Sequence, residues 1–133
     1  LQLVAPALIP GTGMVEHEDA ASLVQRVPAV DLAYLDPPYN QHRYFTNYHV
    51  WETLVRWDAP EHYGIACKRI DSRDERTKSA FNVKRDMPSV FRQVVQSVRA
   101  EVVVVSYNDE SWVSEAELMG WLREAGLPNC SYR

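Results

Sequence analysis

The sequence predicts an α/β fold in which helices wind around a mainly parallel sheet. Segments typical of strands and of helices alternate along the chain, and this alternation implies right-handed crossovers between parallel strands. Four consecutive valines at 102–105 indicate a strand buried on both faces, as at the centre of a parallel sheet. The chain has 133 residues, 46% of them hydrophobic, so it can bury a core but leaves little room for a second domain.

The first expected elements are short. Segment 1–10 is apolar but broken by two prolines, which favours a strand remnant or an extended arm, and a glycine-containing turn follows it. A short strand is expected over 14–17. Asp19 is well placed to cap a helix that Pro28 ends.

A strand and a helix are expected in the middle of the sequence. The apolar run 30–35 predicts a strand that ends at Asp36. A loop then leads into a helix over 48–57, in which Val50 and Leu54 share a face with Trp57.

The C-terminal third contains two further helices. One is expected over 87–99, directly before the valine strand. The other spans 114–125, where Ser114 and Glu117 have the spacing of a capping box. Residues 129–133 are expected to start another strand.

Basic charge is concentrated in one segment, although the net charge of the chain is −4. Residues 68–85 hold seven basic and three acidic side chains, a local charge of +4. Because the segment lacks apolar periodicity before Phe81, we predict a mobile basic loop. It either lies along a phosphate backbone or is solvated without a partner.

Composition excludes several classes of protein. No stretch approaches the roughly 20 apolar residues of a membrane span, and no charged start followed by an apolar segment suggests a signal peptide. We therefore expect a cytoplasmic protein with no membrane partner. Cys67 and Cys130 are far apart, with no CxxC pair and no histidine cluster, so neither a disulfide nor a metal site is expected.

The most informative motif follows the strand 30–35. Asp36, Pro37, Pro38 and Tyr39 place a carboxylate and an aromatic ring at the end of this strand. The carboxylate and a carbonyl of the Pro-Pro turn can accept hydrogen bonds from an exocyclic amine, while Tyr39 offers a flat face to a base removed from its duplex. These groups suit alkylation of the amine of a planar base. The alternative is a plain turn after a strand, with Tyr39 half-buried.

A second polar segment, at 106–108, follows the valine strand. In open α/β sheets, ligands bind beyond the carboxyl ends of the strands. Ser106 and Asn108 are therefore expected beside Asp36, where they bond its loop or line a base pocket. Alternatively, they are only turn residues.

Together these motifs resemble the D12 class of adenine-specific DNA methyltransferases. The resemblance is carried by DLAYLDPPYN at 31–40, RY at 43–44, NYH and ETL at 47–54, and SYN at 106–108. It extends from about Asp19 to the C-terminus. It implies that residues 1–133 are the C-terminal catalytic portion of a Rossmann-like, S-adenosylmethionine-dependent methyltransferase fold whose N-terminal strands are missing.

The resemblance implies a site-specific DNA adenine N6-methyltransferase that transfers the methyl group of S-adenosylmethionine to a flipped adenine in double-stranded DNA. Asp36, Pro37, Pro38 and Tyr39 would be catalytic. Asp19 and Asp36 would contact the donor, and the capping role of Asp19 is compatible with this. The implied substrate-binding residues are Tyr39, Asn40, Arg43, Tyr44, Tyr48, Ser106 and Asn108.

The chain departs from the family's pattern upstream of Asp19. No F-x-G-x-G donor motif occurs there, and the DNA-recognition insertion that precedes DPPY in the family is missing. Gly11-Thr12-Gly13 has neither an uninterrupted strand before it nor a helix directly behind it, so we interpret it as a turn. We expect an inactive isolated chain that needs an N-terminal half or a second subunit.

Two alternatives to adenine methylation remain. Related motifs occur in N4-cytosine and RNA guanine-N2 methyltransferases, which would use the same scaffold on another base. A non-catalytic nucleic-acid-binding or subunit module would need no methyl donor at all.

Overall fold

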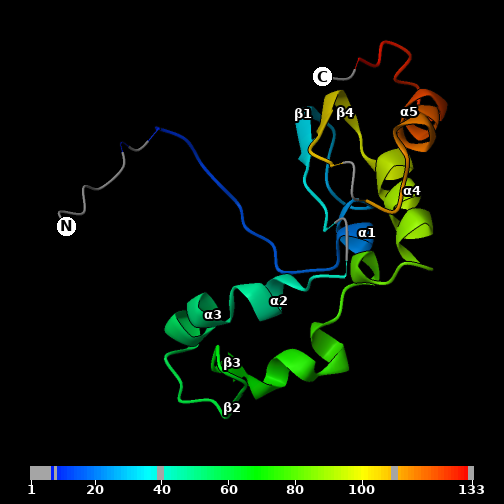
Figure 1. Ribbon diagram of the computed structural model, residues 1–133. Coiled ribbons are helices and arrows are strands. Elements are labelled where there is room, and N and C mark those ends of the chain that lie inside the picture. Colours follow the sequence, from blue (N-terminus) through cyan, green and yellow to red (C-terminus); the bar gives the residue numbers. More distant parts are fainter. Residues whose placement is uncertain (1–6, 8, 39–40, 109–110, 132–133) are drawn as a thin grey trace.

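The computed structural model describes residues 7, 9–38, 41–108 and 111–131 (Figure 1). Its α-helices and strands are α1 (Ala20–Leu23), β1 (Val30–Leu35), α2 (Tyr44–Asn47), α3 (His49–Arg56), β2 (His62–Tyr63), β3 (Lys68–Arg69), α4 (Met87–Ser97), β4 (Ala100–Val105) and α5 (Glu115–Glu124). Three 3₁₀ helices lie between β3 and α4: η1 (Ile70–Arg73), η2 (Glu75–Thr77) and η3 (Ala80–Asn82). The fold is therefore mixed α/β.

Strands β1 and β4 form a parallel two-stranded sheet. Their register runs from Val30 opposite Ala100 to Leu35 opposite Val105, so the two strands end side by side. A parallel pair needs a crossover connection, and here all the elements from α2 to α4 lie within it. This confirms the expected parallel pairing and brings the two polar segments that follow the strands to the same edge.

Helices α4 and α5 pack against one face of this sheet (Figure 1). The buried apolar residues come from η3, α4, α5 and the segment before α5: Phe81, Met87, Phe91, Val94, Val95, Val113, Leu118 and Leu122. From the sheet, Leu35, Val103 and Val105 pack against them. We call β1, β4, α1, η3, α4 and α5 together the sheet region.

The other face of the sheet is open in the described chain. Successive side chains of a strand point to opposite faces, so Val102 and Val104 lie on the face away from α4 and α5 and are 51% and 41% exposed. The prediction of a strand buried on both faces is therefore wrong for these described residues.

Residues 43–79 form a second group of elements, which we call the ion-pair region (Figure 1). Strands β2 and β3 pair antiparallel as a short hairpin, and β3 contacts α3. The buried residues of this region are polar: Arg69 and Ser72 are each 2% exposed. Arg69 donates hydrogen bonds to both carboxylate oxygens of Asp58 and of Asp71, at 2.5–3.0 Å.

Several predicted boundaries agree with these elements. Helix α1 begins after Asp19 as expected, although it is short, and α3, α4 and α5 begin within a residue of the predicted helices. The capping box at the start of α5 is confirmed, because Ser114 and Glu117 bond each other reciprocally through side chain and backbone.

Other predictions differ from the structure. Residues 14–17 form no strand, and neither do 129–131, while 132–133 lie outside the described residues. Segment 68–85 was predicted as a basic loop, but most of it folds into β3, η1, η2 and η3. Hydrogen bonds from Arg69 to Thr53 and Asp58, and from Arg43 to Ser72, hold it to residues distant in sequence, and hydrophobic periodicity does not indicate such bonds. Among the described residues, no helix is long and apolar enough to cross a membrane.

Candidate active site

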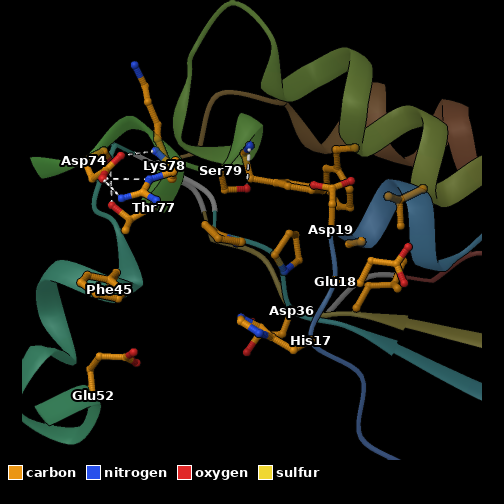
Figure 2. A pocket seen from close by; sticks show the side chains of 18 of the residues that line it. His17, Glu18, Asp19, Asp36, Phe45, Glu52, Asp74, Thr77, Lys78 and Ser79 are labelled. Atoms are coloured by element: carbon orange, nitrogen blue, oxygen red, sulfur yellow. Dashed lines mark hydrogen bonds and ion pairs between the residues drawn. The ribbon is translucent and has the colours of Figure 1, made fainter. Parts of the chain in front are cut away.

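A hollow of about 990 Å³ opens at the carboxyl end of β1. Figure 2 shows that its labelled side chains come from two sides. One side carries His17, Glu18, Asp19 and Asp36; the other carries Phe45, Glu52, Asp74, Thr77 and Lys78. The hollow thus lies between the sheet region and the ion-pair region.

Asp36 stands at the point where β1 leaves the sheet. The Ser106 N–H donates to the Leu35 carbonyl at 2.9 Å, which ties the end of β4 to the end of β1. Beyond it, Pro37 and Pro38 are half-buried, border the hollow and have no N–H of their own. Among the described residues, no side chain or N–H bonds the Asp36 carboxylate. Both of its oxygens can therefore accept hydrogen bonds from a ligand.

Asp19 borders the same hollow while it caps α1. Its Oδ1 accepts hydrogen bonds from the N–H groups of Ala21 and Ser22, at 3.0 and 3.3 Å. No described group donates to Oδ2. The two roles predicted for Asp19 are therefore compatible in this geometry, since one oxygen caps the helix and the other can meet a ligand in the hollow.

Basic side chains on the opposite wall are largely paired. Arg76 donates to Asp74 Oδ2 from Nε and Nη2, at 2.9 and 2.6 Å, and this guanidinium lowers the pKa of Asp74 to about 2. Lys78 lies 3.4 Å from Glu75. Of the seven basic side chains in 68–85, only Arg76 and Lys78 border the hollow.

Arg43 forms hydrogen bonds with the backbone of this wall. Its Nη1 donates to the carbonyls of Ser72 and Asp74, at 3.1 and 3.3 Å, and its side chain is 22% exposed. Arg43 does not border the hollow. The substrate contact that the resemblance implies for Arg43 would therefore compete with the hydrogen bonds that fix the backbone beside Arg76.

The remaining predicted substrate residues lie near the hollow but not on its surface. Tyr44 and Tyr48 form an edge-to-face ring pair with centroids 5.8 Å apart. Ser106 and Asn108 follow β4 at the same edge as Asp36, as expected, and Asn108 Oδ1 is buried with no hydrogen-bond partner among the described residues. Tyr39 and Asn40 lie outside the described residues.

Several lining residues were missed by the sequence analysis. Tyr34 borders the hollow because it lies two residues before Asp36, on the same face of β1, and strand alternation could have identified it. Phe45, Glu52 and Arg76 come from the ion-pair region, and no local pattern in the sequence indicates that they face Asp36.

The family model of the D12 class N6 adenine-specific DNA methyltransferases matches residues 1–119. The chain belongs to this family. It is 35% identical over 119 residues to the type II methyltransferase M.FokI of Planomicrobium okeanokoites, an alignment that covers 88% of the chain and 17% of that relative.

Two further curated relatives are similar. The modification methylase StsI of Streptococcus sanguinis is 35% identical over 81% of the chain and 16% of its own length. The type II methyltransferase M.CviAII of Paramecium bursaria Chlorella virus 1 is 31% identical over 83% of the chain and 31% of its own length. The chain thus spans less than a third of each of these relatives. No solved structure matches.

The D12 residues in this chain fit part of a methyl donor. Asp19 and Asp36 offer one hollow carboxylate oxygens that no described group bonds, which suits hydrogen-bond donors such as an adenine amine. The turn at Gly11 and Gly13 does not border the hollow, and a Cβ added at either glycine would meet no atom within 4 Å. Neither glycine is therefore required for a close approach of the described backbone.

Proposed function

We propose that this chain carries the base-binding part of a site-specific DNA adenine N6-methyltransferase that uses S-adenosylmethionine. The observation that carries the proposal is the Asp36 carboxylate, which has no partner among the described residues and stands at the end of a parallel strand, with Pro37 and Pro38 beside it in the hollow. Membership of the D12 family supports adenine as the base and DNA as the substrate.

Asp36 orients the amine for attack. The lone pair of an exocyclic amine is delocalised into the adenine ring, so the nitrogen becomes nucleophilic only when it is turned out of the ring plane. Hydrogen bonds from the amine to the Asp36 carboxylate and to a carbonyl of the Pro-Pro turn hold it in that geometry. Bound S-adenosylmethionine supplies an electrophilic methyl group. Transfer of this methyl group to the amine nitrogen would break its bond to sulfur and release S-adenosylhomocysteine. The methylated, cationic nitrogen would be acidic enough to lose its proton to water, so no separate general base is needed.

The other predicted residues complete the base pocket in this proposal. Tyr39 stacks on a flipped adenine and Asn40 contributes to binding it, because a base drawn out of its duplex needs a new stacking surface. Ser106 and Asn108 support the loop of Asp36 from the neighbouring strand. Asn108 Oδ1 suits this role since it is buried and has no described partner.

The donor site in this proposal is only half present. Asp19 and Asp36 contact S-adenosylmethionine, whereas its methionine part requires a glycine-rich motif that the chain does not contain. The motif and further strands of a Rossmann-like sheet lie in an N-terminal half or a second subunit, and the isolated chain is inactive. The complete enzyme acts in the cytoplasm on double-stranded DNA.

Base-resolved product analysis tests the reaction. The complete methyltransferase containing these residues is incubated with methyl-labelled S-adenosylmethionine and duplex DNA, and the nucleosides are separated. We expect label only in N6-methyladenine. Label in N4-methylcytosine, or in RNA guanine when RNA is offered, would assign the hollow to a different base.

Calorimetric titration tests the half-site. We expect the isolated chain to bind S-adenosylmethionine more weakly than micromolar, because Asp19 and Asp36 make only part of the contacts. Micromolar binding by the purified chain would show that its residues form a complete donor site.

A further inference from the structure

Helix α3 exposes its apolar face to solvent and turns its polar face toward the protein, the opposite of an ordinary surface helix. Its side toward the protein is polar: Arg69 Nη1 donates to Thr53 Oγ1 at 3.2 Å, and Arg56 pairs with Asp71 at 3.3 Å. Its side toward solvent carries Val50, Trp51, Leu54 and Val55. An amphipathic helix in a monomer normally buries its apolar side, so this orientation is the reverse of the usual one.

Neighbouring segments extend this apolar surface. Val50 and Leu54 form a shallow groove with Pro60 and with the turn between β2 and β3. That turn carries Ile65, which is fully exposed, and Trp57 directly follows α3. We call Val50, Trp51, Leu54, Val55, Trp57 and Ile65 the α3 surface.

The composition of the α3 surface suits a protein partner. It contains two tryptophans, and the charged residues on either side of Trp57, Arg56 and Asp58, are paired within the chain; the centres of protein interfaces are likewise rich in tryptophan and poor in free charge. DNA binding would require lysine or arginine in this position. The surface is also distinct from the hollow, because none of its six residues lines it.

The exposed area is enough for a pair of identical chains. Trp51 and Trp57, 64% and 85% exposed, offer on the order of 300 Å² together. The four aliphatic side chains add roughly as much, at about 100 Å² for a fully exposed one. Two such surfaces bury roughly 1,200 Å², which passes the ~1,000 Å² expected of a biological interface.

We propose that the α3 surface is a homodimer interface, in which α3 packs against α3 of a second copy about a twofold axis. A twofold interface uses the same patch on both copies, and an uncharged apolar patch is complementary to itself. Trp51 and Val55 lie near the middle of the contact. The polar side of α3 stays on Arg69 and Asp71, so dimerisation leaves the hollow open.

Sedimentation equilibrium of the chain tests the proposal. We expect a reversible monomer–dimer equilibrium in the micromolar range, with tryptophan emission shifting to shorter wavelength as the concentration rises and Trp51 and Trp57 leave water. A chain that stays monomeric at hundreds of micromolar, with unchanged emission, would overturn it.

Matched variants locate the interface. Trp51→Glu combined with Val55→Lys should weaken dimerisation at least 100-fold, with an unchanged far-ultraviolet circular dichroism spectrum because both side chains are exposed. Leu32→Glu combined with Val102→Lys changes residues of similar exposure on the open face of the sheet and should leave the dimer intact.

The reverse pattern, in which only the sheet variant becomes monomeric, would place the contact on the sheet and refute the proposal. Should the double α3 variant fail to fold, Trp57→Arg serves in its place, since Trp57 lies beyond the helix. A Trp57→Arg chain that dimerises as tightly as the unmodified one would also count against the proposal.

Discussion

The two regions that border the hollow are held together in different ways. In the sheet region, Met87, Phe91 and Val95 are fully buried among other apolar side chains. In the described part of the ion-pair region no apolar side chain is buried, and the centre is Arg69 with the carboxylates of Asp58 and Asp71. Burial of apolar area stabilises at any pH, whereas ion pairs depend on geometry, pH and salt.

Because of this difference, the two regions position the residues of the hollow with different stability. The sheet region fixes Asp36, because β1 is paired with β4 along its whole length and α4 packs behind the sheet. The ion-pair region supplies Phe45, Glu52 and Arg76 on the opposite wall. We expect this wall to open first, since segments with few buried apolar contacts unfold locally at low free energy.

Phe91→Ala should produce the largest change. The ring is fully buried and touches the rings of Phe81, Tyr107 and Trp121, so its removal leaves a cavity. We expect the free energy of unfolding to fall by about 3–5 kcal/mol in urea titrations followed by circular dichroism. A loss below about 1 kcal/mol would mean that apolar packing does not dominate the sheet region.

Arg69→Met should have an intermediate and local effect. Removing one partner of a buried ion pair costs about 3–5 kcal/mol, but Asp58 and Asp71 are about a third exposed, so we expect about 2 kcal/mol. Hydrogen exchange should rise in the ion-pair region and stay unchanged in α4 and β4.

Arg85→Met is the matched control, because Arg85 pairs with Asp86 but its side chain is 90% exposed. It should change the stability by less than about 0.5 kcal/mol. An equal effect of the two substitutions would remove the distinction between a buried and an exposed arginine.

Acid should weaken the ion-pair region before the sheet region. Hydrogen bonds from Arg69 hold the pKa of Asp58 and of Asp71 below its ordinary value in the folded chain. Their stabilisation is therefore complete above about pH 4, the unfolded value, and is lost as the pH falls through the lower folded values. Resonances of α3 and β3 should change before those of α4 in an NMR titration. If the resonances of both regions change at the same pH, this order is contradicted.

Ser114→Ala should have the smallest effect, confined to the start of α5. The Ser114 hydroxyl accepts from the Glu117 N–H, and the Glu117 carboxylate in turn bonds the Ser114 N–H. Loss of such a cap costs about 1 kcal/mol, measurable in thermal unfolding. Glu115→Ala, in the same turn but outside the capping box, should cost less. If it costs more, the cap is not what stabilises this helix end.

The sheet region was largely predictable because its signals are local. The capping box of α5, the helical periodicity of α4 and the apolar run of β1 each lie within a few residues. In the ion-pair region helix α3 was predicted, but the contacts that hold the region together were not, since Arg69 meets Asp58 across 11 residues and Arg43 meets Ser72 across 29. The sequence identified four residues of the hollow, namely Asp19, Asp36, Pro37 and Pro38. It did not identify Phe45 and Arg76, because only the distant contacts within the ion-pair region bring these two residues to the hollow.

The role of Asp36 is tested most directly by comparing it with Asp31, a carboxylate within β1. Asp36 borders the hollow, whereas Asp31 is exposed near the other end of β1 and does not. In the complete methyltransferase, Asp36→Ala should lower kcat about 10²–10⁴-fold with DNA binding retained, and Asp31→Ala should leave kcat unchanged. Methylation that survives Asp36→Ala undiminished would contradict the assignment of this carboxylate to the adenine amine.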